Sequence, residues 1–289
     1  MAASGEGLNY AVAVDGSDLS HKAFDAVACL FSQKPEKDDR FFVIHVKDSS
    51  KDYLPAHLTP KHIIEDAKTG CIKRRITEDK VITVLEEKEG STLSTLLSVA
   101  RKEHIDFLGI GSYGRKGPKS STASSDSSTS TFGTVSDGAL RDCPASIVIA
   151  KPSSTIPDQS VHFMVCVDNS PNSWRAADMA IAMAKRTVSP DITLLYVDRF
   201  ESFKQKVMEK ADKKLADNDI HGQGVFLKKG PKSIGETIVD YAIEHDVHFV
   251  VLGSTGHKHQ AGNAHTVGTV SGYCAHHAPM CTVLVKPKM

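Results

Sequence analysis

Two stretches of the chain combine glycine and hydroxyl residues in a pattern that suits a phosphate group. The first reads LGIGSYGRKGPKSSTASSDSSTSTFGTVSDG over residues 108–138, and the second reads VLGSTGHKHQAGNAHTVGTVSG over residues 251–272. Each has two glycines directly after an apolar run and a Gly-Thr pair further on. Glycines let backbone N–H groups approach an anion closely, and Gly-Thr opens a predicted helix whose first N–H groups can receive negative charge. The phosphate-loop pattern GxxxxGK[ST] is absent.

The two glycine patterns belong to a tandem duplication. Both continue with Val-Ser, and both copies end in a short strand followed by Lys-Pro, as PASIVIAKP (144–152) and PMCTVLVKP (279–287). The gap before the Gly-Thr pair is 18 residues in the first copy and 11 in the second. An aspartate, Asp15 or Asp168, ends the first strand-like run of each copy. Its carboxylate suits hydroxyl or amino donors of a nucleoside, which completes a nucleotide-like set of groups.

The elements that must position these residues are alternating strands and helices. Most strand-like runs are continuously apolar, which predicts strands buried on both faces of a parallel sheet, and amphipathic helical stripes lie between them. The pattern predicts an α/β fold of two repeated doubly wound sheets with strand order 3-2-1-4-5. In that order strands one and four flank the ligand crevice. The predicted strands cover 10–15, 41–46, 80–86, 106–111 and 145–150, then 162–168, 192–198, 224–229, 248–253 and 281–286.

The domain boundaries follow from the repeat. We expect domain 1 over residues 1–152, a Pro- and Ser-containing linker over 153–160, and domain 2 over 161–289. Residues 116–131 are rich in Ser and Thr, with one alanine as the only apolar side chain besides proline, and they interrupt the first glycine pattern. Such a composition cannot bury a core, so it predicts a disordered surface insertion, with a phosphorylated regulatory segment as the functional alternative.

The overall composition excludes several classes of protein. Lys plus Arg and Asp plus Glu both number 35, so no global basic field favours nucleic acid. No apolar run is long enough to span a membrane, and the first residues, MAASGEGLNY, do not form a secretion leader. The six cysteines are scattered without a CxxC pair, which favours reduced thiols. We therefore expect a neutral cytoplasmic protein without nucleic-acid or membrane partners.

These motifs together resemble those of the universal stress proteins, with two UspA-type domains in tandem. The ATP-binding members carry G-x2-G-x9-G-[ST], which both glycine patterns match apart from their longer gaps. The segments VDGSDLS (14–20), IHV (44–46) and LYV (195–197) also match, so that the resemblance spans nearly the whole chain. It implies the Rossmann-like fold of the adenine-nucleotide alpha hydrolases. It also implies pairing of the two domains within the chain through the strands at 145–150 and 281–286.

The resemblance implies ATP or another adenine nucleotide as the ligand, together with Mg²⁺. It also implies a regulatory role in a stress response or in signalling, with little or no turnover. The gap of 11 residues is nearer to the family's nine, so we expect the tighter site in domain 2. In domain 1 the implied nucleotide-binding residues are Asp15, Val46, Ile110, Gly111, Gly114, Gly133, Thr134 and Val135. In domain 2 they are Asp168, Val197, Leu252, Gly253, Gly256, Gly268, Thr269 and Val270.

Three alternatives stay open at the level of sequence. An adenylate-forming or ATP-hydrolysing enzyme is disfavoured because the first strand turns read DGSDLS (15–20) and DNSPNS (168–173) instead of SGGxDS or HxGH. A scaffold that binds proteins through its tandem domains is disfavoured because both copies keep the glycine pattern. A zinc site is disfavoured because the histidines of the second copy have no counterparts in the first; they are His257, His259, His265, His276 and His277. We expect His257 and Lys258 to lie near the phosphates instead.

Overall fold

The structure is a computed structural model that describes residues 7–32, 34–50, 55–117, 132–199, 201, 203–256 and 267–287. The chain forms two compact units, and it passes from the first to the second between Pro152 and Ser153. Among the residues described, no helix is long and apolar enough to cross a membrane.

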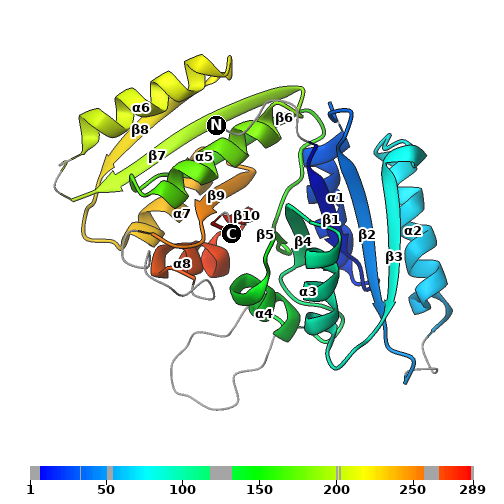
Figure 1. The fold of residues 1–289 in the computed structure, drawn as a ribbon. Helices are drawn as coiled ribbons and strands as arrows, with labels where there is room; N and C mark the ends of the chain where they lie inside the picture. The colour runs from blue at the N-terminus through cyan, green and yellow to red at the C-terminus, as the bar shows by residue number, and fades with distance from the viewer. Residues whose placement is uncertain are drawn as a thin grey trace, which may run out of the picture. The chain divides into compact units, whose positions relative to one another are not determined.

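The described part of unit 1 forms a parallel sheet with the order β3-β2-β1-β4-β5 (Figure 1). Because β1 lies between β2 and β4, the strand order reverses there, and the carboxyl ends of these strands open a crevice. This confirms the predicted α/β fold and the order 3-2-1-4-5. The strands are β1 (Asn9–Ala13), β2 (Arg40–Lys47), β3 (Val81–Glu87), β4 (Phe107–Gly111) and β5 (Ser146–Ala150).

Helix α1 supplies much of the apolar core of unit 1. The side chains of Phe24, Val27 and Phe31 form its apolar stripe and are buried. The rings of Phe24 and Phe31 lie 5.6 and 5.3 Å from the ring of Phe41 on β2. Such aromatic contacts add to the free energy of burial. The helices are α1 (Asp18–Ser32), α2 (Pro60–Lys73), α3 (Thr92–Lys102) and α4 (Thr134–Asp142), with short 3-10 turns at Ala56–Leu58 and Glu78–Lys80.

Unit 2 repeats the same plan, with the strand order β8-β7-β6-β9-β10. Its strands are β6 (Ser160–Cys166), β7 (Ser189–Asp198), β8 (Gly222–Lys228), β9 (Phe249–Gly253) and β10 (Cys281–Val285). Its helices are α5 (Pro171–Ala184), α6 (Lys204–Asp217), α7 (Ile234–Glu244) and α8 (Thr269–His277). By the same strand order we expect a second crevice at the carboxyl ends of β6 and β9.

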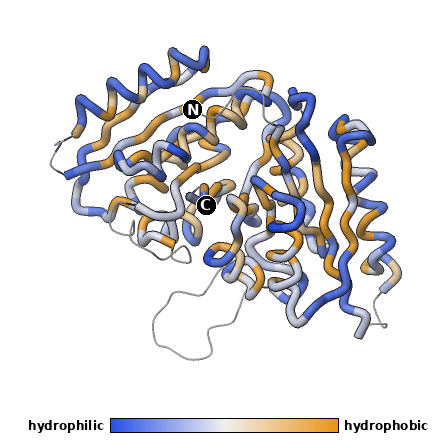
Figure 2. Tube along the Cα trace, viewed as in Figure 1, coloured by the Kyte–Doolittle hydropathy of each residue, from blue (hydrophilic) through white to orange (hydrophobic). Residues whose placement is uncertain are grey.

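Burial along the strands agrees with their apolar sequences. Strands β5, β9 and β10 are buried along their whole length. The central part of β2 runs as a hydrophobic band in Figure 2. The segment predicted as a linker packs on unit 2, because the hydroxyls of Ser153 and Ser154 both donate to the Pro279 carbonyl. Strand β6 already begins at Ser160, the last residue of that segment.

Candidate functional site

A cavity of about 810 Å³ lies at the carboxyl ends of β1, β2 and β4 in unit 1. Its size falls within the range of small-molecule sites in proteins. The structure brings all eight of the residues expected in domain 1 to its wall, which are Asp15, Val46, Ile110, Gly111, Gly114, Gly133, Thr134 and Val135. Three strand ends and the first turn of α4 supply them, as the predicted topology requires.

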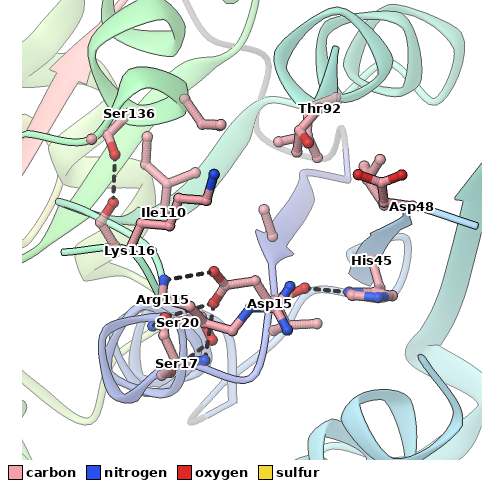
Figure 3. Close-up of a pocket in the computed structure, with 18 of the residues that line it drawn as sticks. Asp15, Ser17, Ser20, His45, Asp48, Thr92, Ile110, Arg115, Lys116 and Ser136 are labelled. Atoms are coloured by element: carbon pink, nitrogen blue, oxygen red, sulfur yellow. Dashed lines mark hydrogen bonds between the residues drawn. The ribbon is translucent and has the colours of Figure 1, made fainter. Parts of the chain in front are cut away.

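Asp15 is the acidic group of this cavity, and the chain around it holds its carboxylate in place. It accepts hydrogen bonds from the Ser17 backbone N–H (3.0 Å), the Ser17 hydroxyl (2.6 Å) and the Arg115 backbone N–H (3.3 Å). Figure 3 shows Asp15 between Arg115 and His45. A Cβ on Gly114 would lie 2.6 Å from Asp15 Oδ2, so only glycine lets the loop after β4 meet this carboxylate.

The first glycine of the pattern has a different neighbour. A Cβ on Gly111 would lie 2.8 Å from the Cβ of Leu19, so this glycine lets α1 pack against the end of β4. From the sequence, both glycines are expected to allow the approach of a phosphate. In the structure each makes room for another part of the protein, and the close packing places the loop after β4 at the cavity.

Helix α4 begins at the cavity wall and presents its amino terminus there. Gly133 is the N-cap, and no described side chain caps the helix. The Gly133 N–H donates to the Ser112 carbonyl (2.8 Å), which fixes the start of the helix against the loop after β4. Gly133, Thr134 and Val135 all line the cavity. The first N–H groups of α4 can therefore receive an anion.

Ser136 holds this helix start in position, although the sequence analysis did not name it. Its buried hydroxyl donates to the Gly111 carbonyl at 3.0 Å. In unit 2 the Ser271 hydroxyl donates to the Gly253 carbonyl at 2.7 Å. The signal was present in the sequence, because both glycine patterns continue with Val-Ser.

Several charged and titratable side chains line the same cavity in addition to the eight expected residues. Arg115 and Lys116 follow Gly114 and bring positive charge to the wall, while His45 and Lys47 come from β2. The His45 Nδ1–H donates to the Val14 carbonyl at 2.7 Å. Burial lowers the pKa of His45, and the positive charge of Arg115 acts in the same direction. His45 is therefore a neutral group at neutral pH.

Unit 2 repeats the local geometry of the loop. Asp168 Oδ1 accepts from the Ser170 N–H at 3.0 Å, and a Cβ on Gly256 would lie 2.7 Å from Asp168 Oδ2. The Gly268 N–H donates to the Ser254 carbonyl at 2.7 Å, as Gly133 does to Ser112. The remaining predicted residues stand at matching places, at the ends of β7 and β9 and at the start of α8, and they are Val197, Leu252, Gly253, Thr269 and Val270.

Some of the expectations fall on residues outside the described part of the chain. These include His257, Lys258, His259 and His265, and residues 118–131 of the Ser/Thr-rich insertion. The ranking of the two sites and the placement of His257 near the phosphates remain predictions. The described residues contain no group of three or more His, Cys, Asp or Glu side chains that could hold a metal ion.

Comparison with known proteins adds a family to this geometry. The sequence profile of the universal stress protein family matches residues 9–151 and again residues 161–286. A search of curated proteins finds no match. Among solved structures, a universal stress protein from Archaeoglobus fulgidus DSM 4304 is similar, with 15% identity, a TM-score of 0.65, and coverage of 96% of this chain and 98% of that chain.

A second similar structure is a functionally unknown protein from Pseudomonas aeruginosa PAO1. It shares 12% identity at a TM-score of 0.59, and the alignment covers 96% of this chain and 92% of that chain. At these identities the two structures show a common fold. Both alignments extend over nearly the whole chain, and therefore over both of its units.

Proposed function

The chain belongs to the universal stress protein family, and on this premise we propose that it binds an adenine nucleotide, ATP with Mg²⁺, at the cleft of each unit. The observation that carries the proposal is the cavity of about 810 Å³ in unit 1, whose wall collects all eight expected residues. In this proposal the protein is a regulator of a stress response or a signalling pathway.

The chemistry of the wall supports a nucleotide over a neutral metabolite. The first N–H groups of α4 would take the phosphates, and Arg115 and Lys116 would neutralise part of their charge. Asp15 keeps acceptor capacity for ribose hydroxyls or the adenine amino group. The backbone of Val46 at the end of β2 would contact the adenine ring. Mg²⁺ would enter on the phosphate oxygens.

Slow or absent turnover is part of the same proposal. A hydrolase needs a general base within hydrogen-bond reach of the attacking water. The Asp15 carboxylate already accepts three hydrogen bonds, two from Ser17 and one from the Arg115 N–H of the loop after β4. A carboxylate engaged in this way holds the cleft together, which fits binding better than proton transfer.

The test is titration calorimetry of the full chain with ATP, ADP and AMP, each with and without Mg²⁺. We expect saturable binding with a Kd of about 1–100 μM, which corresponds to roughly 5.5–8 kcal/mol. Mass spectrometry of nucleotide released from freshly purified, denatured protein should identify the bound species. If millimolar nucleotide gives neither heat nor a thermal shift, the proposal is wrong and a scaffold for other proteins becomes the better interpretation.

A further inference from the structure

Where their strands begin, the two units use different side chains to extend the hydrogen bonding between the first and fourth strands. In unit 2 the His248 backbone N–H donates to the His162 carbonyl at 3.0 Å. In the other direction the His162 backbone N–H donates to Nδ1 of the His248 ring, also at 3.0 Å. The imidazole thus supplies the acceptor that extends the ladder between β6 and β9 at the edge opposite the cleft.

Unit 1 has the same pair of hydrogen bonds with a carboxylate in place of the imidazole. The Asp106 backbone N–H donates to the Asn9 carbonyl at 2.9 Å, and the Asn9 backbone N–H donates to Asp106 Oδ2 at 2.8 Å. The Asn9 amide also donates to the carbonyls of Glu103 and His104. We call these two pairs of hydrogen bonds the Asn9–Asp106 junction and the His162–His248 junction. They differ mainly in whether the side-chain acceptor is a carboxylate or an imidazole.

An imidazole nitrogen accepts a hydrogen bond only while it carries no proton. In the folded state Nδ1 of His248 must be the bare nitrogen, and Nε2 carries the hydrogen. Protonation would place an N–H against the His162 N–H and remove the bond. A carboxylate stays an acceptor until the pH approaches about 4. Burial lowers the pKa of His248, and the nearby His162 lowers it further, while Asp246 acts in the opposite direction.

The groups packed around His248 determine how the junction responds to acid. His162 donates from Nδ1 to the His245 carbonyl at 3.1 Å, and its Nε2 lies 3.0 Å from the Thr193 hydroxyl. The hydroxyl can donate to a bare Nε2 or accept from a protonated one, so His162 can gain a proton without losing a partner.

Asp191 lies 3.9 Å from Nε2 of His162. Asp191 also pairs with the ring of His221 at 2.9 Å. A charged His162 would in turn oppose a charge on His248. Of these two histidines, therefore, only His248 loses a hydrogen bond when its ring is protonated.

We propose that the His162–His248 junction is an acid-sensitive latch that loosens unit 2 as the pH falls below neutrality, while the Asn9–Asp106 junction of unit 1 stays closed. The latched strands lead directly to the second cleft, because β6 runs on to Asp168 and β9 ends at Gly253. Acid would thus break this junction of unit 2, while the matching junction of unit 1 keeps its carboxylate acceptor.

The direction in which stability changes with pH follows from the difference in proton binding by His248 between the folded and unfolded states. The unfolded state binds a proton at the ordinary histidine pKa of about 6.5, and the folded state resists it. The stabilisation is complete above that pH and is lost as the pH falls toward the lowered pKa of the folded state. Below pH 6.5 the unfolding constant should rise by about tenfold per pH unit while His248 alone responds.

Trp174 provides a local readout of unit 2. It is the only tryptophan of the chain, and it lies buried on α5, which packs against β6 and β9. Urea unfolding of the full chain, followed by Trp174 fluorescence at pH 7.5 and 5.5, measures the unfolding constant. Between the two pH values we expect this constant to rise by up to about tenfold more in the wild type than in His248→Asp, which copies unit 1.

Two control variants locate the responsible group. His221→Gln changes an exposed ring and should keep the wild-type response. His162→Asn copies Asn9 and should also respond, because the acceptor on His248 is retained. An equal pH response in the wild type and His248→Asp overturns the proposal. The proposal is also wrong if His162→Asn is the only variant that loses the pH response.

If His248→Asp does not fold, a variant that introduces the imidazole acceptor into unit 1 tests the proposal instead. Asp106→His should make the Asn9 amide exchange with deuterium at pH 5.5 about tenfold faster, relative to its intrinsic rate, than in the wild type. Unchanged protection of that amide contradicts the latch.

Discussion

The serine that follows the Gly-Thr pair stabilises each cleft through one hydrogen bond. In unit 2 the buried Ser271 hydroxyl donates to the Gly253 carbonyl at 2.7 Å, so its removal leaves that carbonyl without this partner. We expect Ser271→Ala to lower the free energy of unfolding of unit 2 by about 1 kcal/mol. Urea unfolding followed by Trp174 fluorescence measures the change. The exposed Ser189→Ala should have no effect, and an equal loss in both variants contradicts the assignment.

The sequence predicted which residues surround the cleft better than it predicted what they do. All eight residues expected in unit 1 line one cavity, because motif spacing and strand order determine backbone position. The contacts of single side chains depend on packing that the sequence does not show. Gly111 makes room for Leu19, and Gly114 makes room for the Asp15 carboxylate. The Val-Ser repeat marks Ser136 in the sequence, but its hydrogen bond to Gly111 and the place of His45 at the wall follow only from the three-dimensional structure.

Helix α7 depends on a capping box at its amino terminus. The Ser233 hydroxyl accepts from the Glu236 N–H at 3.2 Å, and the Ser233 N–H donates to the Glu236 carboxylate at 2.7 Å. We expect Ser233→Ala to lower the stability of unit 2 by about 1 kcal/mol, whereas Ser233→Asp should restore most of it. The midpoint of urea unfolding, read by Trp174 fluorescence, tests this. A Ser233→Asp variant as unstable as Ser233→Ala would argue against capping.

The hydrogen bonds from Ser233 also lower the pKa of the Glu236 carboxyl. A carboxyl group whose pKa is lowered on folding stabilises the protein at pH values above its unfolded-state pKa. This stabilisation is lost as the pH falls through the folded-state pKa. In the Ser233→Ala variant this acid-dependent contribution should shrink. The difference in stability between the wild type and the variant should therefore be smaller at pH 3 than at pH 7.

At the level of elements, the strands were predictable to within about three residues, and two helices were not singled out. The continuous apolar runs of the central strands are a strong signal because both faces are buried. Helices α2 and α6 pack against β3 and β8, the outer strands of the two units, and bury only one narrow stripe each. Most of α6 is hydrophilic, as Figure 2 shows, so its periodicity is weak.

For the molecule as a whole, the duplication raises the question of how the two clefts would share the proposed nucleotide. Both keep the aspartate, the glycines and the helix start, but their gaps are 18 and 11 residues. The entropy of loop closure grows with the logarithm of loop length, so the longer gap costs about 0.4 kcal/mol more, or about twofold in affinity. Loop length alone therefore favours the second cleft slightly, and charge on each loop can alter that difference.

Matched substitutions of the second glycine in each pattern test this division of binding. A Cβ would lie 2.6 Å from Asp15 Oδ2 in Gly114→Ala and 2.7 Å from Asp168 Oδ2 in Gly256→Ala. Both distances are too short, so the methyl group must displace the carboxylate from the backbone donors that hold it. We expect each variant to lose the site of its own unit and to lower the ATP stoichiometry measured by calorimetry from about two to about one.

The affinity that remains in each variant reports the other cleft. Gly114→Ala should keep the tighter site, and Gly256→Ala should keep a site about twofold weaker, since the difference in loop closure is small. Gly230→Ala serves as the control, because no described atom lies within 4 Å of the added Cβ. Tighter residual binding in Gly256→Ala than in Gly114→Ala would reverse the ranking. Unchanged stoichiometry in both variants would show that the nucleotide does not depend on the aspartates that these glycines accommodate.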